Sequence, residues 1–319
     1  MVKYTKRAID ISGMRDIIQR RVPVVKLDSG KPGPTVCVTG CIHGNEPGGI
    51  AIIHELIRTV RRVGLKRGVI HALPLVNSMG FEHASRYINS DREDLNRCFP
   101  GDPKGSMGQR FAFRLFEGIK RVKPDLCIDL HNDWVQSVPY VVLEARGLYR
   151  KSGLRKKANE AAAATGLLTV QESDGDEDMT STLTGALVAE GIPAFVIEAG
   201  AAGAIIESSV VAGRDAILGV FKQLGMIDAE PKTKPHRAAT KVHDYTSRPL
   251  CTSSGLIRFL VSPGDEIRVN QPLARVFSAF GMVEETMRAE CDGFVLGVTD
   301  HARVTPGYEV IAIAELGAG

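Results

Sequence analysis

The sequence of 319 residues has no C-x-x-C pair, no strong excess of one charge and no long uninterrupted apolar run. Its six cysteines are scattered, most of them in apolar stretches, which is typical of reduced thiols in a cytosolic protein. Residues Met1 to Gly13 contain no apolar stretch long enough for a signal peptide. We therefore expect a cytoplasmic protein.

The most apolar region, Gly185 to Ile206, is not expected to cross a membrane because Glu190, Pro193 and Glu198 interrupt it. A net charge of +3 is too small to indicate a nucleic-acid-binding surface, although it does not exclude an anionic substrate. The expected partner is a small molecule rather than a nucleic acid or a membrane. The sequence leaves open whether the protein forms a homo-oligomer.

Short apolar runs alternate with longer helix-like segments from Thr35 to about Gly225. The runs predict strands at Thr35–Thr39, Val69–Leu75, Leu126–Leu130, Tyr140–Leu143, Leu168–Gln171 and Ala194–Glu198. The longer segments predict helices at Gly49–Val63, Gly108–Val122, Leu148–Ala164, Thr182–Glu190 and Ser208–Leu224. Such alternation predicts an α/β domain with a mostly parallel sheet, whose ligands bind outside the carboxyl ends of the strands.

The chain length suits one large and one small domain. Residues 227–248 are rich in Pro and Lys and poor in apolar residues, which indicates a linker. We therefore predict an α/β domain over 1–226 and a small all-β domain over 249–319, joined by that linker.

The last segment contains a weak repeat, whose halves begin at Gly255 and Gly293. Two such halves resemble the barrel-sandwich fold of biotinyl and lipoyl domains. Those carriers attach their cofactor to a lysine, whereas the last lysine of this chain is Lys241. The resemblance therefore concerns the fold and not a carrier function.

The segment from Gly40 to Gly49 contains His43 and Glu46 and lies between a predicted strand and a predicted helix. A histidine and a carboxylate three residues apart in a Gly-rich turn can both reach one metal ion, and zinc accepts both at roughly 2.0–2.2 Å. The alternative is a polar loop that caps the helix, since H-x-x-E also arises by chance.

A third candidate ligand, His131, follows the apolar run Leu126–Leu130 and so lies at the same edge of the sheet. Two histidines and one glutamate leave the fourth tetrahedral position of zinc open, as in catalytic sites. A single histidine at a strand end can instead be structural. Two such clusters at one edge favour a metal site.

Three further candidates are polar. Asp94-Leu-Asn96-Arg97 lies in a loop-like stretch, where Arg97 offers a planar fork for a carboxylate and Asn96 an additional hydrogen bond. A surface turn with a salt bridge is the alternative. Arg86 is a second cation in the same connection, and Glu198 ends an apolar strand, where burial would raise its pKa towards that of a general base.

Together these motifs resemble the succinylglutamate desuccinylase and aspartoacylase family, which is related to the zinc carboxypeptidases. The resemblance runs from about Val36 to Gly200, with the motifs in the family's order. It implies a zinc-carboxypeptidase-like mixed sheet flanked by helices, with one zinc ion per chain bound by His43, Glu46 and His131. It also implies that the small β domain helps to close over the site.

The resemblance assigns the remaining roles as well. Asn96 and Arg97 would hold the substrate carboxylate, and Asp94 would orient a zinc-binding histidine, His43. Arg86 would polarise the scissile carbonyl, although about three extra residues separate it from the D-x-N-R motif. Glu198 would be the general base that activates water and then returns its proton to the leaving amine.

The implied function is a zinc-dependent deacylase that removes an acyl group from an N-acylated amino acid. One alternative is a metallocarboxypeptidase acting on short peptides, because the same residues serve that reaction. A second is a binding protein without turnover, although all of the expected positions are filled. Five acidic residues within 172–178 either select substrates with a free amine or form a solvated loop.

Overall fold

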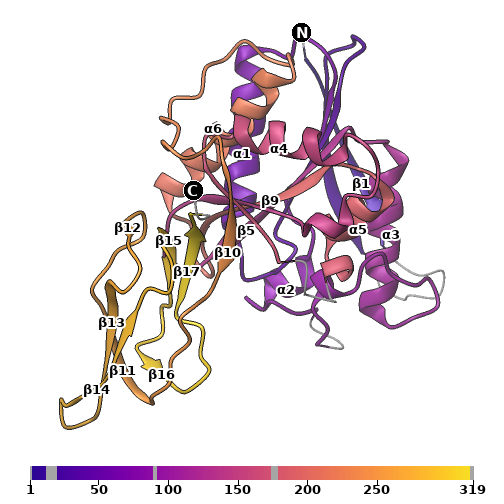
Figure 1. Ribbon diagram of the computed structural model, residues 1–319. Coiled ribbons are helices and arrows are strands. Elements are labelled where there is room, and N and C mark those ends of the chain that lie inside the picture. The colour runs from indigo at the N-terminus through magenta and orange to yellow at the C-terminus, as the bar shows by residue number, and fades with distance from the viewer. Residues whose placement is uncertain (1, 12–19, 89–91, 174–178, 317–319) are drawn as a thin grey trace.

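The computed structural model describes residues 2–11, 20–88, 92–173 and 179–316. A large mixed sheet crosses the molecule with helices on both of its faces, and a second, four-stranded antiparallel sheet lies at the C-terminal end (Figure 1). The predicted α/β fold class with a C-terminal β region is confirmed. In the described part of the chain, no helix is both long and apolar enough to span a membrane.

Four parallel strands form the centre of the large sheet: β4 (Val69–Leu73), β3 (Thr35–Gly40), β5 (Leu126–Asp133) and β9 (Ala194–Ala201), in that order. Nearly all of their side chains are buried, as expected for strands covered on both faces. Because these strands run in the same direction, the residues that follow β3 and the last residues of β5 meet at one edge of the sheet.

The flanking strands make the sheet mixed rather than mostly parallel. At one side, β1 (Lys3–Asp10) and β2 (Arg21–Asp28) extend it in antiparallel pairing. At the other side, β7 (Tyr140–Leu143) runs antiparallel to β9, and β8 (Leu168–Gln171) runs parallel to β7. The sequence analysis predicted neither of the two N-terminal strands. β1 is largely exposed, and β2 alternates between buried and exposed residues only over its first half.

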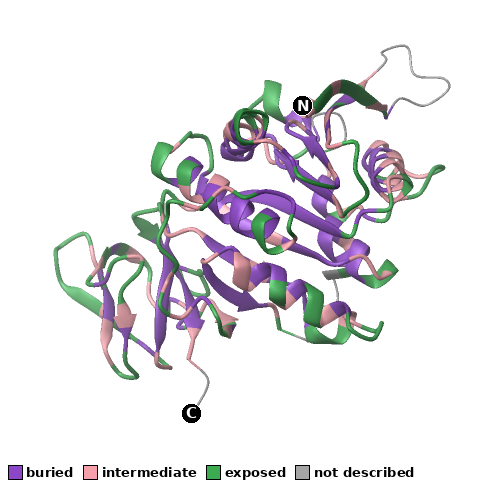
Figure 2. Ribbon diagram, turned by 90° about the horizontal axis from the view of Figure 1, so that it is seen from above, coloured by how far each residue is buried: buried purple, intermediate pink, exposed green. Residues whose placement is uncertain are grey.

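The helices form two layers. One face of the sheet carries α1 (Gly48–Val63), α4 (Leu154–Ala164) and α6 (Glu207–Gln223), whereas the other carries α3 (Met107–Arg121), α5 (Leu183–Glu190) and the short α2 (Ser78–Glu82). Side chains along a strand point alternately to the two faces of the sheet, so one strand packs against both helix layers. In β3, Val36 and Val38 belong to the core on the first face and Cys37 to the core on the second. Figure 2 shows the buried strands between helices whose outer surfaces are exposed.

Four of the five predicted helices begin and end within one residue of their predicted bounds. The exception is α4, which was expected to begin at Leu148 and begins at Leu154. A short 3-10 turn occupies Arg146–Leu148, and Gly153 adopts a left-handed conformation with φ of 76° directly before the helix. A left-handed residue cannot continue a right-handed helix, so the helical pattern is cut there.

As far as residue 316, where the described structure ends, the C-terminal region contains seven strands: β11 (Gly255–Phe259), β12 (Glu266–Ile267), β13 (Pro272–Phe277), β14 (Val283–Arg288), β15 (Gly293–Val298), β16 (Arg303–Val304) and β17 (Ile311–Glu315). The strands β14, β13, β11 and β16 form the second sheet, whereas β17, β15 and β12 continue the large one. The C-terminal strands therefore join the first 226 residues through shared hydrogen bonding as well as through the chain.

The junction is strand β10 (Val242–Thr246), which lies within the expected linker and pairs with β8 on one side and β17 on the other. Its own sequence carries little strand signal, so the pairing on both sides explains why it is extended. The division into domains at 226 and 249 stays a prediction.

Candidate metal centre

The loop between β3 and α1 brings His43 and Glu46 to the edge of the sheet. The Glu46 backbone N–H donates to the His43 carbonyl at 3.1 Å, which closes a tight turn. Gly44 packs against the backbone of α2 so closely that an added Cβ would lie 1.9 Å from the Gly80 carbonyl carbon. The glycine is therefore needed for the loop to reach α2, and the turn directs both side chains inward.

His131 reaches the same point from β5, as the strand-end argument predicts. One ligand atom from each of His43, Glu46 and His131 lies within 4.8 Å of the others, and all three residues are buried. The two imidazole rings are 4.9 Å apart between centroids. The backbone N–H of Asn132 also donates to Glu46 Oε2 at 3.1 Å, which ties the loop to the strand.

Each histidine presents one ring nitrogen to Glu46 and the other to an aspartate. Nδ1 of His43 lies 2.7 Å from Glu46 Oε1, and Nδ1 of His131 lies 3.1 Å from Glu46 Oε2. The Nε2 atoms lie 3.2 Å from Asp94 Oδ1 and 2.9 Å from Asp129 Oδ2. Carboxylates that hold the outer nitrogen fix the ring orientation and direct the inner nitrogen towards a metal.

Asp129 was not among the predicted site residues. Its side chain is fully buried, and its Oδ1 accepts a hydrogen bond from the Thr39 hydroxyl at 2.5 Å. A signal was present, because Asp129 and His131 are two residues apart on a strand and so share one face. The D-x-H pattern at a strand end therefore predicts a histidine together with the carboxylate that orients it.

The donor set fits a divalent metal such as zinc. Ligands about 2.1 Å from a tetrahedral zinc lie roughly 3.4 Å from one another, close to the separations of Glu46 from the two Nδ1 atoms. Burial opposes the charge on Glu46, but His131 and His43 outweigh it and hold the pKa of that carboxyl well below its usual range. Glu46 is thus ionised, as a metal ligand must be.

Arg86 lies beside this centre despite the extra residues that follow it. Its Nε donates to Asp94 Oδ2 at 2.9 Å, and its Nη1 lies 3.6 Å from Glu46 Oε1. Burial opposes the charge on Asp94, whereas His43 and Arg86 favour it, and the pKa of Asp94 falls below its usual range. Asp94 therefore links the histidine to the arginine.

Asn96 and Arg97 face the same cavity as the metal-ligand candidates. Asn96 is buried, and its Oδ1 accepts from the Leu183 N–H at 2.9 Å, so part of its hydrogen-bonding capacity supports the start of α5. Arg97 is exposed, and its Nη1 donates to the Asn96 carbonyl at 2.9 Å. The Arg97 guanidinium group thus lies at the rim of the cavity, where its contact with the Asn96 carbonyl holds it.

Glu198 lies on β9 in register with His131 on β5. The side chain is half-buried, and its Oε2 has no hydrogen-bond partner among the described residues. Burial raises the pKa of Glu198 well above its usual range, which the positive charge of His131 partly opposes. A carboxyl in this position is available to exchange a proton with a molecule in the cavity.

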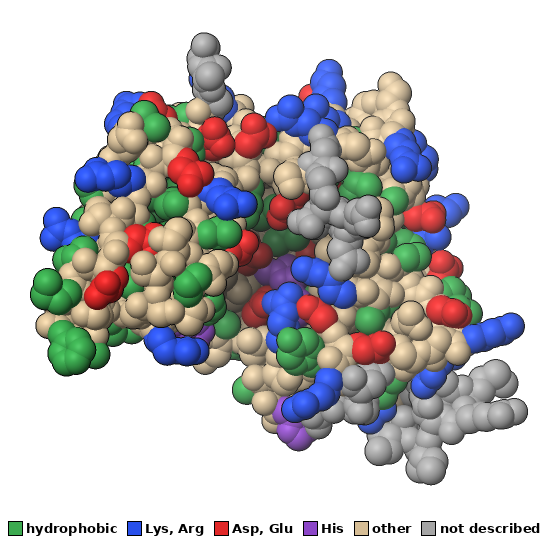
Figure 3. Space-filling model, turned by 60° about the horizontal axis from the view of Figure 1, so that its bottom comes forward, with side chains coloured by type: hydrophobic (Ala, Val, Ile, Leu, Met, Phe, Trp, Pro, Cys, Tyr) green, Lys and Arg blue, Asp and Glu red, His purple; other side chains and the backbone are tan. Residues whose placement is uncertain are grey.

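The cavity has a volume of about 250 Å³ and is lined by all of the predicted site residues except Asp94. Figure 3 shows a hollow with a histidine at its base and acidic and basic side chains around it. Two further carboxylates that the sequence analysis did not single out, Asp133 and Glu144, also line it, as does Glu172. Glu172 begins the expected acidic loop, whose residues 174–178 lie outside the described residues. None of the lining residues comes from 249–319, so a covering role of that region stays a prediction.

Residues 32–224 match the family profile described as the succinylglutamate desuccinylase/aspartoacylase catalytic domain, which is more than half of the chain. The chain belongs to this family. The proteins for which the family is named are deacylases. The chain is therefore related in sequence and in fold to deacylases of the amidohydrolase type.

Similar proteins agree with the family assignment. The chain is 25% identical over 301 residues to the Nα-acetyl-L-2,4-diaminobutyric acid deacetylase of Halomonas elongata, covering 92% of this chain and 86% of that protein. A succinylglutamate desuccinylase/aspartoacylase structure from Rhodobacter sphaeroides has a TM-score of 0.78 at 25% identity, covering 97% of this chain and 95% of that chain. A metallo-carboxypeptidase from Burkholderia cenocepacia shares the fold, with a TM-score of 0.55 at 16% identity over 69% of this chain and 65% of that one.

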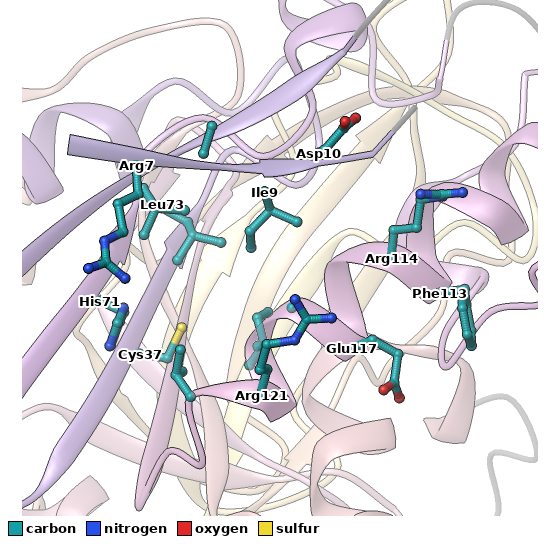
Figure 4. Close-up of a pocket in the computed structure, with 15 residues that line it drawn as sticks. Arg7, Ile9, Asp10, Cys37, His71, Leu73, Phe113, Arg114, Glu117 and Arg121 are labelled. Atoms are coloured by element: carbon teal, nitrogen blue, oxygen red, sulfur yellow. The ribbon is translucent and has the colours of Figure 1, made fainter. Parts of the chain in front are cut away.

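A larger cavity of about 730 Å³ lies between β1 and α3 and shares no lining residue with the family's site. Its wall includes Arg7 of β1, His71 of β4, and Arg114 and Arg121 of α3 (Figure 4). Its volume exceeds that of the site, but the convergent metal donors lie elsewhere. Side-chain chemistry rather than volume therefore identifies the functional site.

Proposed function

We propose that this protein is a zinc-dependent hydrolase that removes the acyl group from an N-acylated amino acid or a related small molecule. The observation that carries the proposal is the convergence of His43, Glu46 and His131 beside a small cavity in which Glu198 has an unpartnered oxygen. The absence of disulfides among the six cysteines, which all lie in the described part, supports a cytoplasmic location.

The three donors would hold one zinc ion, which when bound lowers the pKa of water and polarises a carbonyl group. Glu198 takes a proton from the attacking water and returns it to the leaving amine.

Arg86 and the two substrate-binding residues complete the proposed chemistry. The Arg86 guanidinium, positioned by Asp94, stabilises negative charge on the carbonyl oxygen during attack. Asn96 and Arg97 hold the substrate carboxylate, so that the amide stays in position for reaction. Asp94 and Asp129 act through the histidines and are positioning residues.

The size of the cavity favours a small substrate over a peptide, because about 250 Å³ is below the usual range for drug-sized ligands. The Halomonas relative, named for a deacetylase of an N-acetylated amino acid, supports the same class. The likeness to a metallo-carboxypeptidase keeps peptide hydrolysis as the second candidate.

The proposal is tested by metal analysis and by product identification. We expect about one zinc per chain in freshly purified protein, loss of activity on chelation, and recovery with added zinc. N-acetyl amino acids should release acetate, whereas dipeptides should be poor substrates. Protein without bound metal, or preferential release of amino acids from dipeptides, would contradict the proposal.

Replacing Arg97 by alanine should raise KM on the order of 10- to 100-fold, because a charge-assisted contact to the substrate carboxylate is lost. The free energy of unfolding should change little, since the Arg97 side chain is exposed. Arg97→Lys keeps the charge but not the planar fork and should give an intermediate KM. A large fall in Tm with a normal KM would make Arg97 structural instead.

A further inference from the structure

Glu144 is a buried carboxyl in the wall of the cavity that the proposed mechanism does not use. It follows β7, and only 3% of its surface is exposed. Its Oε2 has no hydrogen-bond partner among the described residues. Because an unsatisfied buried carboxylate is costly, its retention beside a substrate cavity indicates that a ligand supplies the missing partner.

The nearby protein groups fix the backbone of Glu144 and leave this oxygen free. Gln171 Nε2 donates to the Glu144 carbonyl at 2.9 Å. The guanidinium groups of Arg146 and Arg155 donate to Gln171 Oε1, at 3.2 and 3.1 Å, rather than to the Glu144 side chain. Both arginines therefore hold the Gln171 side chain, which in turn holds the backbone of Glu144.

Burial raises the pKa of Glu144 to about 7. A hydrogen bond from the Thr184 side chain lowers this pKa, whereas the negative charge of Glu172 raises it. The positive charge of Arg97 lowers that pKa, but the proposed function engages Arg97 with the substrate carboxylate. A second cation in the cavity would therefore stabilise the ionised form of Glu144 near neutral pH.

The strands place Glu144 at the far end of an apolar floor that begins at Glu198. Tyr140 of β7 is in register with Glu198 of β9, and Val142 is in register with Val196. Both valines line the cavity, and Glu144 follows on the same strand face as Val142. It lies roughly 13 Å along the strand from the position opposite Glu198.

We propose that Glu144 accepts the ammonium group of the substrate side chain and makes the enzyme selective for N-acylated diamino acids. The inference rests on the proposed deacylase function and specifies its substrate. Methylene groups of that side chain would lie on Val142 and Val196, and the terminal ammonium would supply the partner that Glu144 Oε2 lacks. Asp133 and Glu172, which also line the cavity, would repel a second carboxylate.

The wild-type enzyme tests this with matched substrates. The cationic pair is Nα-acetyl-2,4-diaminobutyrate and Nα-acetylornithine, and their neutral counterparts of equal length are Nα-acetylnorvaline and Nα-acetylnorleucine. Nα-acetylglutamate supplies the negative charge. We expect kcat/KM for the better cationic substrate to exceed that of its neutral counterpart by on the order of 10-fold or more, with the glutamate derivative the poorest.

Glu144→Gln keeps the side-chain shape and removes the charge. We expect the ratio of kcat/KM between each cationic substrate and its neutral counterpart to fall to near one, whereas Glu160→Gln, on the exposed surface of α4, keeps the wild-type ratio. A merely structural role would lower both members of a pair equally and leave the ratio unchanged, which would overturn the inference. The same holds if Glu172→Gln, and not Glu144→Gln, removes the preference.

The outcomes separate the two proposals. Hydrolysis of neutral and cationic substrates at equal rates by the wild-type enzyme overturns the role of Glu144 and leaves the deacylase function intact. No hydrolysis of any N-acetyl amino acid removes both. If the Glu144→Gln protein fails to fold, the wild-type comparison still tests the preference for cationic substrates. Glu172→Gln, which should keep the wild-type ratio, then tests whether Glu172 rather than Glu144 carries that preference.

Discussion

Replacing Glu198 by glutamine is expected to lower kcat on the order of 10²- to 10⁴-fold while the protein keeps its fold and its metal. The amide has the shape of the carboxyl but cannot take a proton from the attacking water. Because Glu198 Oε2 has no partner among the described residues, the substitution breaks no hydrogen bond there. The measurement is steady-state kinetics on an N-acetyl amino acid, with zinc content determined on the same preparation.

The matched control is again Glu160→Gln, whose side chain is exposed and remote from the cavity. It should retain wild-type kcat. Activity of Glu198→Gln within a few-fold of the wild type would mean that another group is the base. A variant that loses both activity and zinc would place Glu198 in the support of the metal site rather than in proton transfer.

The residues of the metal centre could be predicted from sequence because each lies next to a recognisable strand end. His43 and Glu46 follow β3, and His131 ends the apolar part of β5, so a parallel sheet brings them together whatever the rest of the fold does. The roles given to these side chains stay predictions, but their placement follows from local pattern and one general rule.

Glu144 could not be found in this way. Its meaning depends on β7 lying next to β9 in antiparallel register, which is a long-range pairing within an otherwise parallel region. The extended conformation of β10 has the same origin, since its two partners come from distant parts of the chain. Sequence patterns report what each segment buries, but they do not report which segments become neighbours.

Removing either histidine should abolish zinc binding and lower activity by on the order of 10³-fold or more, because the several kcal/mol of stabilisation that a metal contributes to the transition state is lost.

The His43→Ala and His131→Ala variants should nevertheless differ in stability. In His43→Ala, Asp94 keeps its contact with Arg86 Nε at 2.9 Å and is partly exposed. In His131→Ala, the fully buried Asp129 retains only the Thr39 hydroxyl as a side-chain partner in the described structure. An uncompensated buried charge of this kind costs roughly 3–5 kcal/mol, so His131→Ala should unfold at a clearly lower denaturant concentration than His43→Ala.

Both histidine variants are compared as metal-free proteins. The control is His54→Ala on the exposed side of α1, which should keep zinc, activity and stability. Equal stability of the two metal-free variants would show that Asp129 does not depend on His131 for its charge.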